Sequence, residues 1–121
     1  HLKKLPLQIR VYEITGPLFF GAADAIEHIV VKDFTTCLVL RMRSVPAIDA
    51  SAMRSLRDLA ARAKKKHITL IFSHVNEQPM SVMKKDHFIE LIGEEHFLPN
   101  IVEALDYAEN MVADSGHKAA K

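Results

Sequence analysis

Apolar and polar residues follow two different periods along this chain, and the periods predict its secondary structure. Residues 7–12 alternate apolar with polar, which is typical of a strand with one face in water. Two continuous apolar runs, 36–42 and 68–72, indicate strands covered on both faces. A Gly-Pro pair at 16–17 breaks the chain after the first strand. We therefore expect residues 18–20 to form the second arm of a hairpin.

Apolar residues spaced three and four apart predict two helices in the first half of the chain. One covers residues 22–32, and a clearer one follows Asp49, a residue type that caps helix N-termini. Lysines at 64–66 end the second helix, where the helix dipole favours cations. Strands that alternate with helices at this spacing predict an α/β sandwich with crossover helices.

The second half of the chain predicts two more helices and one ambiguous segment. Pro79 suits the first turn of a third helix that reaches at least Lys85. Residues 88–92 either prolong that helix or form a short strand of their own. Asn100, followed three residues later by a glutamate, is a capping-box variant and predicts a last helix to residue 111.

Length and composition predict one domain over residues 1–121. The chain has 121 residues, of which 49% are hydrophobic and 26% charged, enough for one core without disulfides. We expect an ordered core over about 7–112 and disorder in the small, polar tail at 115–121. The one cysteine, Cys37, cannot pair within the chain, which favours a reducing compartment. No uncharged apolar run approaches the ~18–20 residues of a membrane span.

The net charge of +1 conceals an uneven distribution along the chain. Residues 41–66 carry a net charge of +6, whereas residues 77–114 contain nine acids and only two lysines. The chain is therefore a charge dipole along its sequence.

Motifs for catalysis and metal binding are missing from the sequence. None of the seven histidines lies three to five residues from another or beside a cysteine pair, so we predict no metal site and no cofactor. The glycines at 16 and 21 have phosphate-loop spacing, but alanines at 22–23 replace the required Lys and Ser/Thr. Strand ends lack the gathered carboxylates of a phosphorelay receiver. We interpret Cys37 as a buried, inert thiol, and Ser51 has no nearby histidine to activate it. We predict no enzymatic activity.

The turn at 45–52, which leads from a buried strand into the basic helix, is the strongest candidate site. It places Asp49 and Ser51 at a helix N-terminus, where backbone amides favour an anion or a partner's carboxylate. The simpler alternative is that Asp49 only caps the helix.

Three segments carry a resemblance to a known family: VYEITGPLFFGAAD at 11–24, LVLRM at 38–42 and VPAIDASA at 45–52. Matches near Asn100 and Tyr107 extend it, so that it covers the chain from about residue 7 to 112. The chain resembles the STAS domain (sulfate transporter and anti-sigma factor antagonist), and more narrowly the C-terminal STAS domain of SulP-type sulfate permeases. The resemblance implies a mixed sheet of four to five strands flanked by about four helices. It also implies a last helix beside the first and a short strand near 89–92.

The resemblance further implies a non-catalytic regulatory domain on the cytoplasmic side of the inner membrane, in a SulP-family sulfate or related anion transporter. Its expected partners are the transmembrane domain of the same permease, another STAS domain or a regulatory protein. In free-standing family members a kinase phosphorylates the serine directly after the motif aspartate. Here that position is Ala50, so that switch cannot operate, and phosphorylation of Ser51 is a weak alternative.

Two other functions stay open from the sequence. One is a stand-alone, anti-sigma factor antagonist-like partner-switching protein, against which Ala50 argues. The other is a module that senses a nucleotide or anion at the Asp49 turn, and the basic helix also suits anionic lipid headgroups. We expect no nucleic-acid partner. The predicted partner- or ligand-binding residues are Pro46, Ile48, Asp49, Ala50, Ser51, Met53, Arg54 and Arg57.

Overall fold

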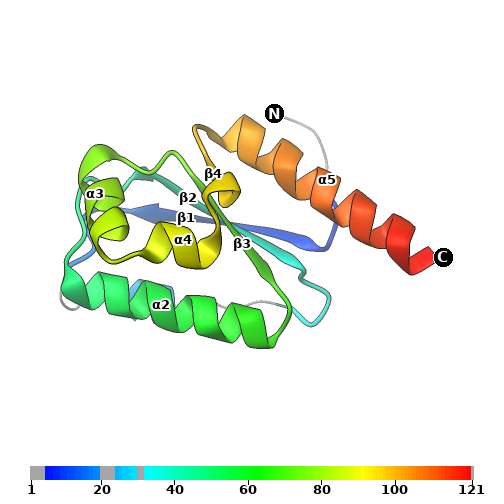
Figure 1. Cartoon of the computed structure of the whole chain (residues 1–121), viewed down its shortest axis with the longest axis horizontal. Coiled ribbons are helices and arrows are strands. Elements are labelled where there is room, and N and C mark those ends of the chain that lie inside the picture. Colours follow the sequence, from blue (N-terminus) through cyan, green and yellow to red (C-terminus); the bar gives the residue numbers. More distant parts are fainter. Residues whose placement is uncertain (1–4, 20–23, 30–31, 121) are drawn as a thin grey trace.

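The computed structural model describes residues 5–19, 24–29 and 32–120, with the side chains at 24–25 and 115–120 left out of the description. Strands and helices alternate along most of the chain, as the sequence predicts (Figure 1). The elements in order are β1 (Ile9–Thr15), α1 (Asp24–Glu27), β2 (Cys37–Ser44), α2 (Ala50–Lys65), β3 (Thr69–Ser73), α3 (Glu77–Lys85), α4 (Phe88–Ile92), a 3-10 turn (Glu94–His96), β4 (Phe97–Leu98) and α5 (Ile101–Ala120).

The four strands form one sheet in the order β1-β2-β3-β4, which confirms the α/β class. Val39 in β2 lies between Val11 of β1 and Ile71 of β3, and Phe72 of β3 pairs with Phe97 of β4. Every pairing among the described strands is parallel, whereas we expected a mixed sheet. The physical reason is that each connection is a crossover, which returns the chain to the same end of the sheet.

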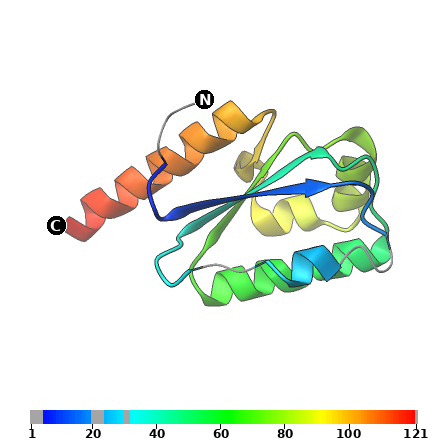
Figure 2. The same ribbon diagram turned by 180° about the vertical axis from the view of Figure 1, so that it is seen from behind.

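The sheet separates two apolar cores, because successive side chains of a strand point to opposite faces. Leu38, Leu40 and Met42 of β2 join a core under α1, α2, α3 and α4. Val39 and its neighbour Cys37 join a second core under α5. Figures 1 and 2 show α2 and α5 on opposite sides of the strands. The expectation that the last helix packs beside the first is therefore wrong.

The segment after β1 does not form a hairpin arm. Leu18 makes a parallel bridge with Ile48, so it continues beside the chain that follows β2. Gly16 directs this path with a φ of +79°, a region that favours glycine, and its N–H donates to the Ser44 carbonyl at 2.9 Å. Residues 20–23 and 30–31 lie outside the described residues, so of the helix predicted over 22–32 the structure describes only α1 and the residues next to it.

The segment at 88–92 is a separate helix, α4, and the short strand lies further on at Phe97–Leu98. The break between α3 and α4 falls at His87, whose φ of +61° is left-handed. Phe88 is fully buried and packs edge-on against Phe72, with the ring centroids 5.7 Å apart. The strand expected near 89–92 is therefore wrong, because core packing of Phe88 in a helical turn outweighs the local apolar run.

Both predicted helix caps on α2 and α5 are confirmed. The Asp49 carboxylate accepts the Ala52 N–H at 2.9 Å at the start of α2. Asn100 and Glu103 form a reciprocal pair, because the Asn100 Oδ1 accepts the Glu103 N–H while the Asn100 amide donates to the Glu103 carboxylate, each at 2.9 Å. α5 continues to Ala120, whereas we expected no regular structure from Ser115. The alanines and lysine in that stretch are good helix formers.

Candidate binding surface at the β2–α2 corner

The predicted site lies where β2 ends and α2 begins, a segment that we call the corner (residues 44–51). Strands β2 and β3 are parallel neighbours, so the loop after β3 leaves the sheet beside the corner. In open α/β sheets this carboxyl edge is where binding residues usually gather.

Two amide side chains that follow β3, Asn76 before α3 and Gln78 in its first turn, hold the corner from one side. The Asn76 amide donates to the carbonyls of Arg43 and Val45, each at 2.9 Å. Gln78 accepts the Ile48 N–H at 2.9 Å and donates to the Ile48 carbonyl at 3.1 Å. These four bonds satisfy backbone groups that no regular element pairs, and they fix the course of the chain through the corner.

The segment after β1 holds the corner from the other side. The Leu18 N–H donates to the Ala47 carbonyl at 2.9 Å, and the Asp49 N–H donates to the Leu18 carbonyl at 3.1 Å. Leu18 itself is buried. The GPLFF and VPAIDAS motifs, far apart in the sequence, are therefore neighbours in space, which the sequence alone did not predict.

The predicted binding residues divide into exposed and buried groups. Ile48 and Met53 are only 2% and 3% exposed, so they pack in the core and cannot themselves contact a partner. Asp49 and Ser51 are half-buried. The exposed members of the predicted set are Pro46, Ala50, Arg54 and Arg57.

The structure brings Asp49 and Ser51 together, but their side chains bond to each other and do not both point at a ligand site. The Ser51 hydroxyl donates to the Asp49 carboxylate at 2.8 Å, and the same carboxylate oxygen caps α2. A charge-assisted bond of this kind holds the hydroxyl in place. Phosphate on Ser51 would add negative charge beside a carboxylate, which is unfavourable.

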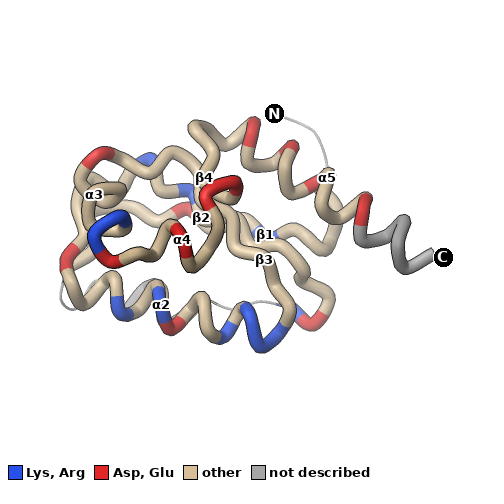
Figure 3. The backbone as a smooth tube through the Cα atoms, in the orientation of Figure 1, with Lys and Arg blue, Asp and Glu red and all other residues tan. Residues whose placement is uncertain are grey.

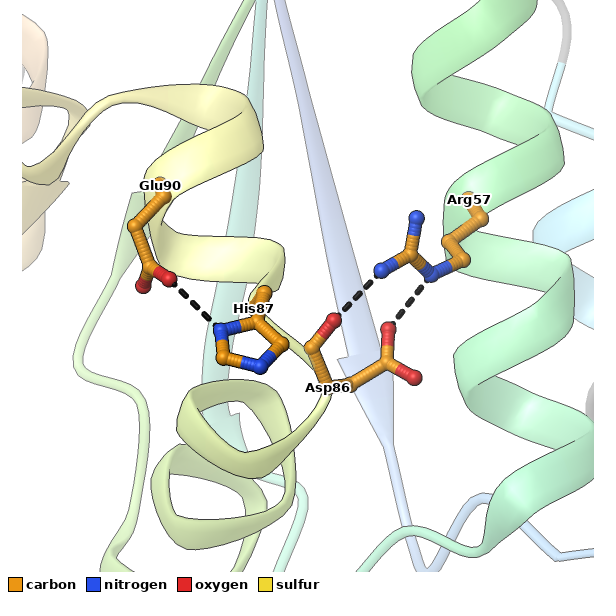
Figure 4. A network of polar contacts seen from close by, with 4 residues as sticks. All are labelled: Arg57, Asp86, His87 and Glu90. Atoms are coloured by element: carbon orange, nitrogen blue, oxygen red, sulfur yellow. Dashed lines mark hydrogen bonds and ion pairs between the residues drawn. The ribbon is translucent and has the colours of Figure 1, made fainter.

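Arg57 lies further along α2 and reaches α3 instead of the corner. Its Nε donates to the Asp86 carboxylate at 2.5 Å, and its Nη2 donates to the Asp86 backbone carbonyl. Figure 4 shows this pair beside a second one, in which the His87 imidazole contacts the Glu90 carboxylate at 2.9 Å. The Arg57 guanidinium therefore joins α2 to the end of α3.

An open hollow of about 810 Å³ lies next to the corner. Its lining residues are Pro46, Asn76, Glu77, Gln78 and Ser81. Sequence reasoning named only Pro46 among them. A signal was available, because Asn76 and Gln78 come soon after the predicted strand at 68–72, and residues that follow neighbouring parallel strands gather at one edge of the sheet.

The uneven charge along the sequence is also uneven in space. Lys and Arg follow α2 on one side of the sheet and Asp and Glu follow α5 on the other, while the segment of α3 and α4 carries both signs (Figure 3). Within the residues that the structure describes, no group of three His, Cys, Asp or Glu side chains could hold a metal ion. The helices of that same part of the chain include none with the length and apolar character to cross a bilayer.

Cys37 lies in β2 in the core under α5 and is 2% exposed. Burial raises the pKa of its thiol, and a hydrogen bond with Thr36 offsets part of that rise. A protonated, enclosed thiol is a poor nucleophile, which supports the interpretation of Cys37 as inert.

The comparisons with known proteins agree with this geometry. The family model of the STAS domain matches residues 3–104. This chain belongs to the STAS domain family. The crystal structure of a sulfate transporter family protein from Wolinella succinogenes superposes with a TM-score of 0.85 at 36% identity, covering 92% of this chain and 93% of that one. The SulP transporter STAS domain of Vibrio cholerae superposes with a TM-score of 0.76 at 26% identity, covering 92% and 88%.

The STAS domain is also similar to part of a longer protein. A Bacillus subtilis protein provisionally named sulfate transporter YvdB is 33% identical over 94 residues, which are 74% of this chain. The matched part is only 17% of the length of that relative. The resemblance to SulP-type transporter STAS domains seen in the sequence is thereby confirmed.

Proposed function

We propose that this STAS domain is the cytoplasmic regulatory domain of a SulP-type sulfate transporter, and that it acts by binding other proteins without catalysing a reaction. The corner carries the proposal, because hydrogen bonds from Leu18, Asn76 and Gln78 hold it in one shape. A surface that is fixed before binding loses little conformational entropy when a partner arrives.

The partner-facing residues that we propose are Pro46 and Ala50 of the corner and Arg54 of α2, all of which are exposed. Ala50 is the first residue of α2 and presents a small, uncharged, exposed surface. The transmembrane domain of the same transporter is the partner that we propose, with another STAS domain or a regulatory protein as further partners. The domain would lie on the cytoplasmic side of the membrane.

Regulation through binding and release of a partner protein fits the corner better than a phosphorylation switch or an anion site. Ala50 has no hydroxyl, and the Ser51 hydroxyl already donates to Asp49. An anion at the N-terminus of α2 would compete with the Asp49 carboxylate for the Ala52 N–H. A nucleotide or sulfate site at this turn therefore has less support than a protein contact.

The experiment measures sulfate uptake by the whole transporter that contains this domain, expressed in cells without sulfate uptake of their own. Ala50→Glu places a bulky charge at the corner, and we expect at least an about fivefold lower uptake rate, the effect of losing one good interface contact. Ala113→Glu is the matched control, because Ala113 is also an exposed helical alanine but lies on α5. Equal uptake by both variants, at equal amounts in the membrane, would contradict the proposal.

A further inference from the structure

The end of the molecule opposite the corner exposes apolar side chains among lysines. Leu7, just before β1, is 74% exposed, and Phe34, just before β2, is 52% exposed. Exposed lysines lie at the end of α2 and directly after it, at the same end of the molecule as these loops. We call this surface the amino-terminal rim, and its residues are Leu7, Lys32, Phe34, Lys64, Lys65 and Lys66.

Backbone hydrogen bonds join the three loops of the amino-terminal rim. The Thr36 N–H donates to the Gln8 carbonyl, and the Thr69 N–H donates to the Thr36 carbonyl, each at 2.9 Å. The segments that lead into β1, β2 and β3 therefore lie side by side. Both ribbon views show the end of α2 at the same end of the sheet as the loop into β2 (Figures 1 and 2).

A tight turn presents Phe34 to solvent. The Thr35 N–H donates to the Lys32 carbonyl at 3.0 Å, and the Lys32 N–H donates to the Thr35 hydroxyl oxygen at 3.2 Å. Thr35 is 4% exposed, so it anchors the turn while the preceding Phe34 points away from the core. Because the turn leaves much of the Phe34 ring in water, folding gains only part of the hydrophobic free energy of burying it. Covering the ring with another apolar phase would gain the rest.

The end of α2 supplies the positive charge of the amino-terminal rim. Lys64, Lys65 and Lys66 are consecutive and exposed, and Lys32 adds a fourth ammonium group. Asp33 is the one acid in the turn next to Phe34. The acidic residues of α5 lie on the other side of the sheet from α2 (Figure 3), where Asp106 and Glu109 line a hollow with Pro6. The positive charge of the amino-terminal rim therefore lies at its α2 side, and this is the side that suits a negative surface.

We propose that the amino-terminal rim docks on an anionic lipid bilayer, with Leu7 and Phe34 among the headgroups and the lysines against the phosphates. Exposed apolar side chains beside lysines are the combination that holds proteins at a membrane interface. A fluid bilayer adapts to separate projecting side chains such as Leu7 and Phe34, which a rigid acidic protein does not. The inference rests on the proposed function in one respect, because a transporter domain lies close to a membrane.

The test measures binding of the 121-residue chain to lipid vesicles by co-sedimentation. We expect binding to vesicles that contain phosphatidylglycerol at about 0.02 M salt, little binding to pure phosphatidylcholine, and release at about 0.5 M salt. Lys65→Gln/Lys66→Gln should weaken vesicle binding at least tenfold, because each lysine near the membrane surface raises the affinity ~5-fold. Lys84→Gln/Lys85→Gln removes the same charge from exposed positions on α3 and should leave binding within about twofold.

The apolar contribution has its own matched pair of variants. Phe34→Ala should weaken vesicle binding about tenfold, whereas Leu91→Ala, which truncates a 55% exposed side chain on α4, should not change it. Thermal unfolding of each variant confirms that it is folded. The proposal is overturned if the chain does not bind anionic vesicles at low salt, if both lysine double variants weaken binding equally, or if Phe34→Ala binds as tightly as the unchanged protein. The sulfate-uptake experiment at Ala50 is independent of this result, so the two proposals can fail separately.

Discussion

The side chain of Gln78 pairs with the backbone of Ile48 as a neighbouring strand would. Its amide oxygen accepts the Ile48 N–H at 2.9 Å, and its amide nitrogen donates to the Ile48 carbonyl at 3.1 Å. Ile48 is 2% exposed, so few water molecules can replace these bonds. The pairing helps to give the corner its fixed shape, and it joins the first turn of α3 to the segment that leads into α2.

Replacing Gln78 tests how much the corner depends on this pairing. We expect Gln78→Ala to lower the free energy of unfolding by about 1–3 kcal/mol, because it leaves two backbone groups of a buried residue without partners. Urea denaturation measures the change. Glu77→Ala, at an exposed neighbouring position, is the control and should stay within about 0.5 kcal/mol. A Gln78→Ala protein as stable as the control would show that water satisfies the corner.

The Arg57–Asp86 pair makes a smaller contribution, because its side chains are 43% and 35% exposed. We expect Arg57→Ala to lower the free energy of unfolding by up to about 1 kcal/mol, and the loss should shrink as salt is added. A double-mutant cycle with Asp86→Ala isolates the pair. A coupling energy near zero in that cycle would leave Arg57 available as a partner-binding residue.

His67 occupies a position that favours glycine. It follows α2 with a φ of +59°, its N–H donates to the Lys64 carbonyl, and the Ile68 N–H donates to the Ala63 carbonyl. This is a Schellman ending with histidine at the left-handed position. We expect His67→Gly to raise the melting temperature by several degrees, from about 0.5–1 kcal/mol of relieved strain.

A glycine two residues earlier is the matched control for His67→Gly. Lys65 is the last residue of α2 and has no left-handed backbone, so Lys65→Gly should destabilise the protein, by at most about 0.5–1 kcal/mol. Calorimetry of the two variants should give shifts of opposite sign. Two shifts in the same direction would show that the histidine side chain makes a favourable contact that outweighs the backbone strain.

Cys37 provides a readout of opening, because burial raises the pKa of the only thiol in the chain. At pH 8 the folded protein should react with a disulfide reagent about 100-fold more slowly than the urea-unfolded protein. The raised pKa also means that the unfolded chain releases this proton first. Stability should therefore decline as the pH rises above the usual cysteine pKa, and Cys37→Ala should lack that part of the decline. Equal labelling rates for folded and unfolded protein would refute the burial of the thiol.

Local patterns predicted the elements whose stability is local. Asp49 caps α2 and Asn100 caps α5 as expected, because a cap needs only the next three residues. β2 was recognisable because both of its faces are covered, which requires an uninterrupted apolar run. The STAS motifs in the sequence likewise indicated the family correctly.

Long-range contacts decided what the sequence did not reveal. A Gly-Pro pair is compatible with a hairpin and with a turn into a parallel bridge. The pairing of Leu18 with Ile48 selects the parallel bridge. Residues 88–92 are apolar enough for a strand, but the burial of Phe88 against Phe72 makes them a helix. In both cases the deciding partner lies at least sixteen residues away in the sequence.

The sequence by itself determined the three main strands, the capped helices, the family and the position of the corner, because periodicity and capping act over neighbouring residues. Only the tertiary structure decided which of the expected binding residues face solvent, since Ile48 and Met53 became core, and it added Asn76 and Gln78 as the residues that hold the corner. Parallel strands bring together residues thirty positions apart, and no local pattern records such a distance.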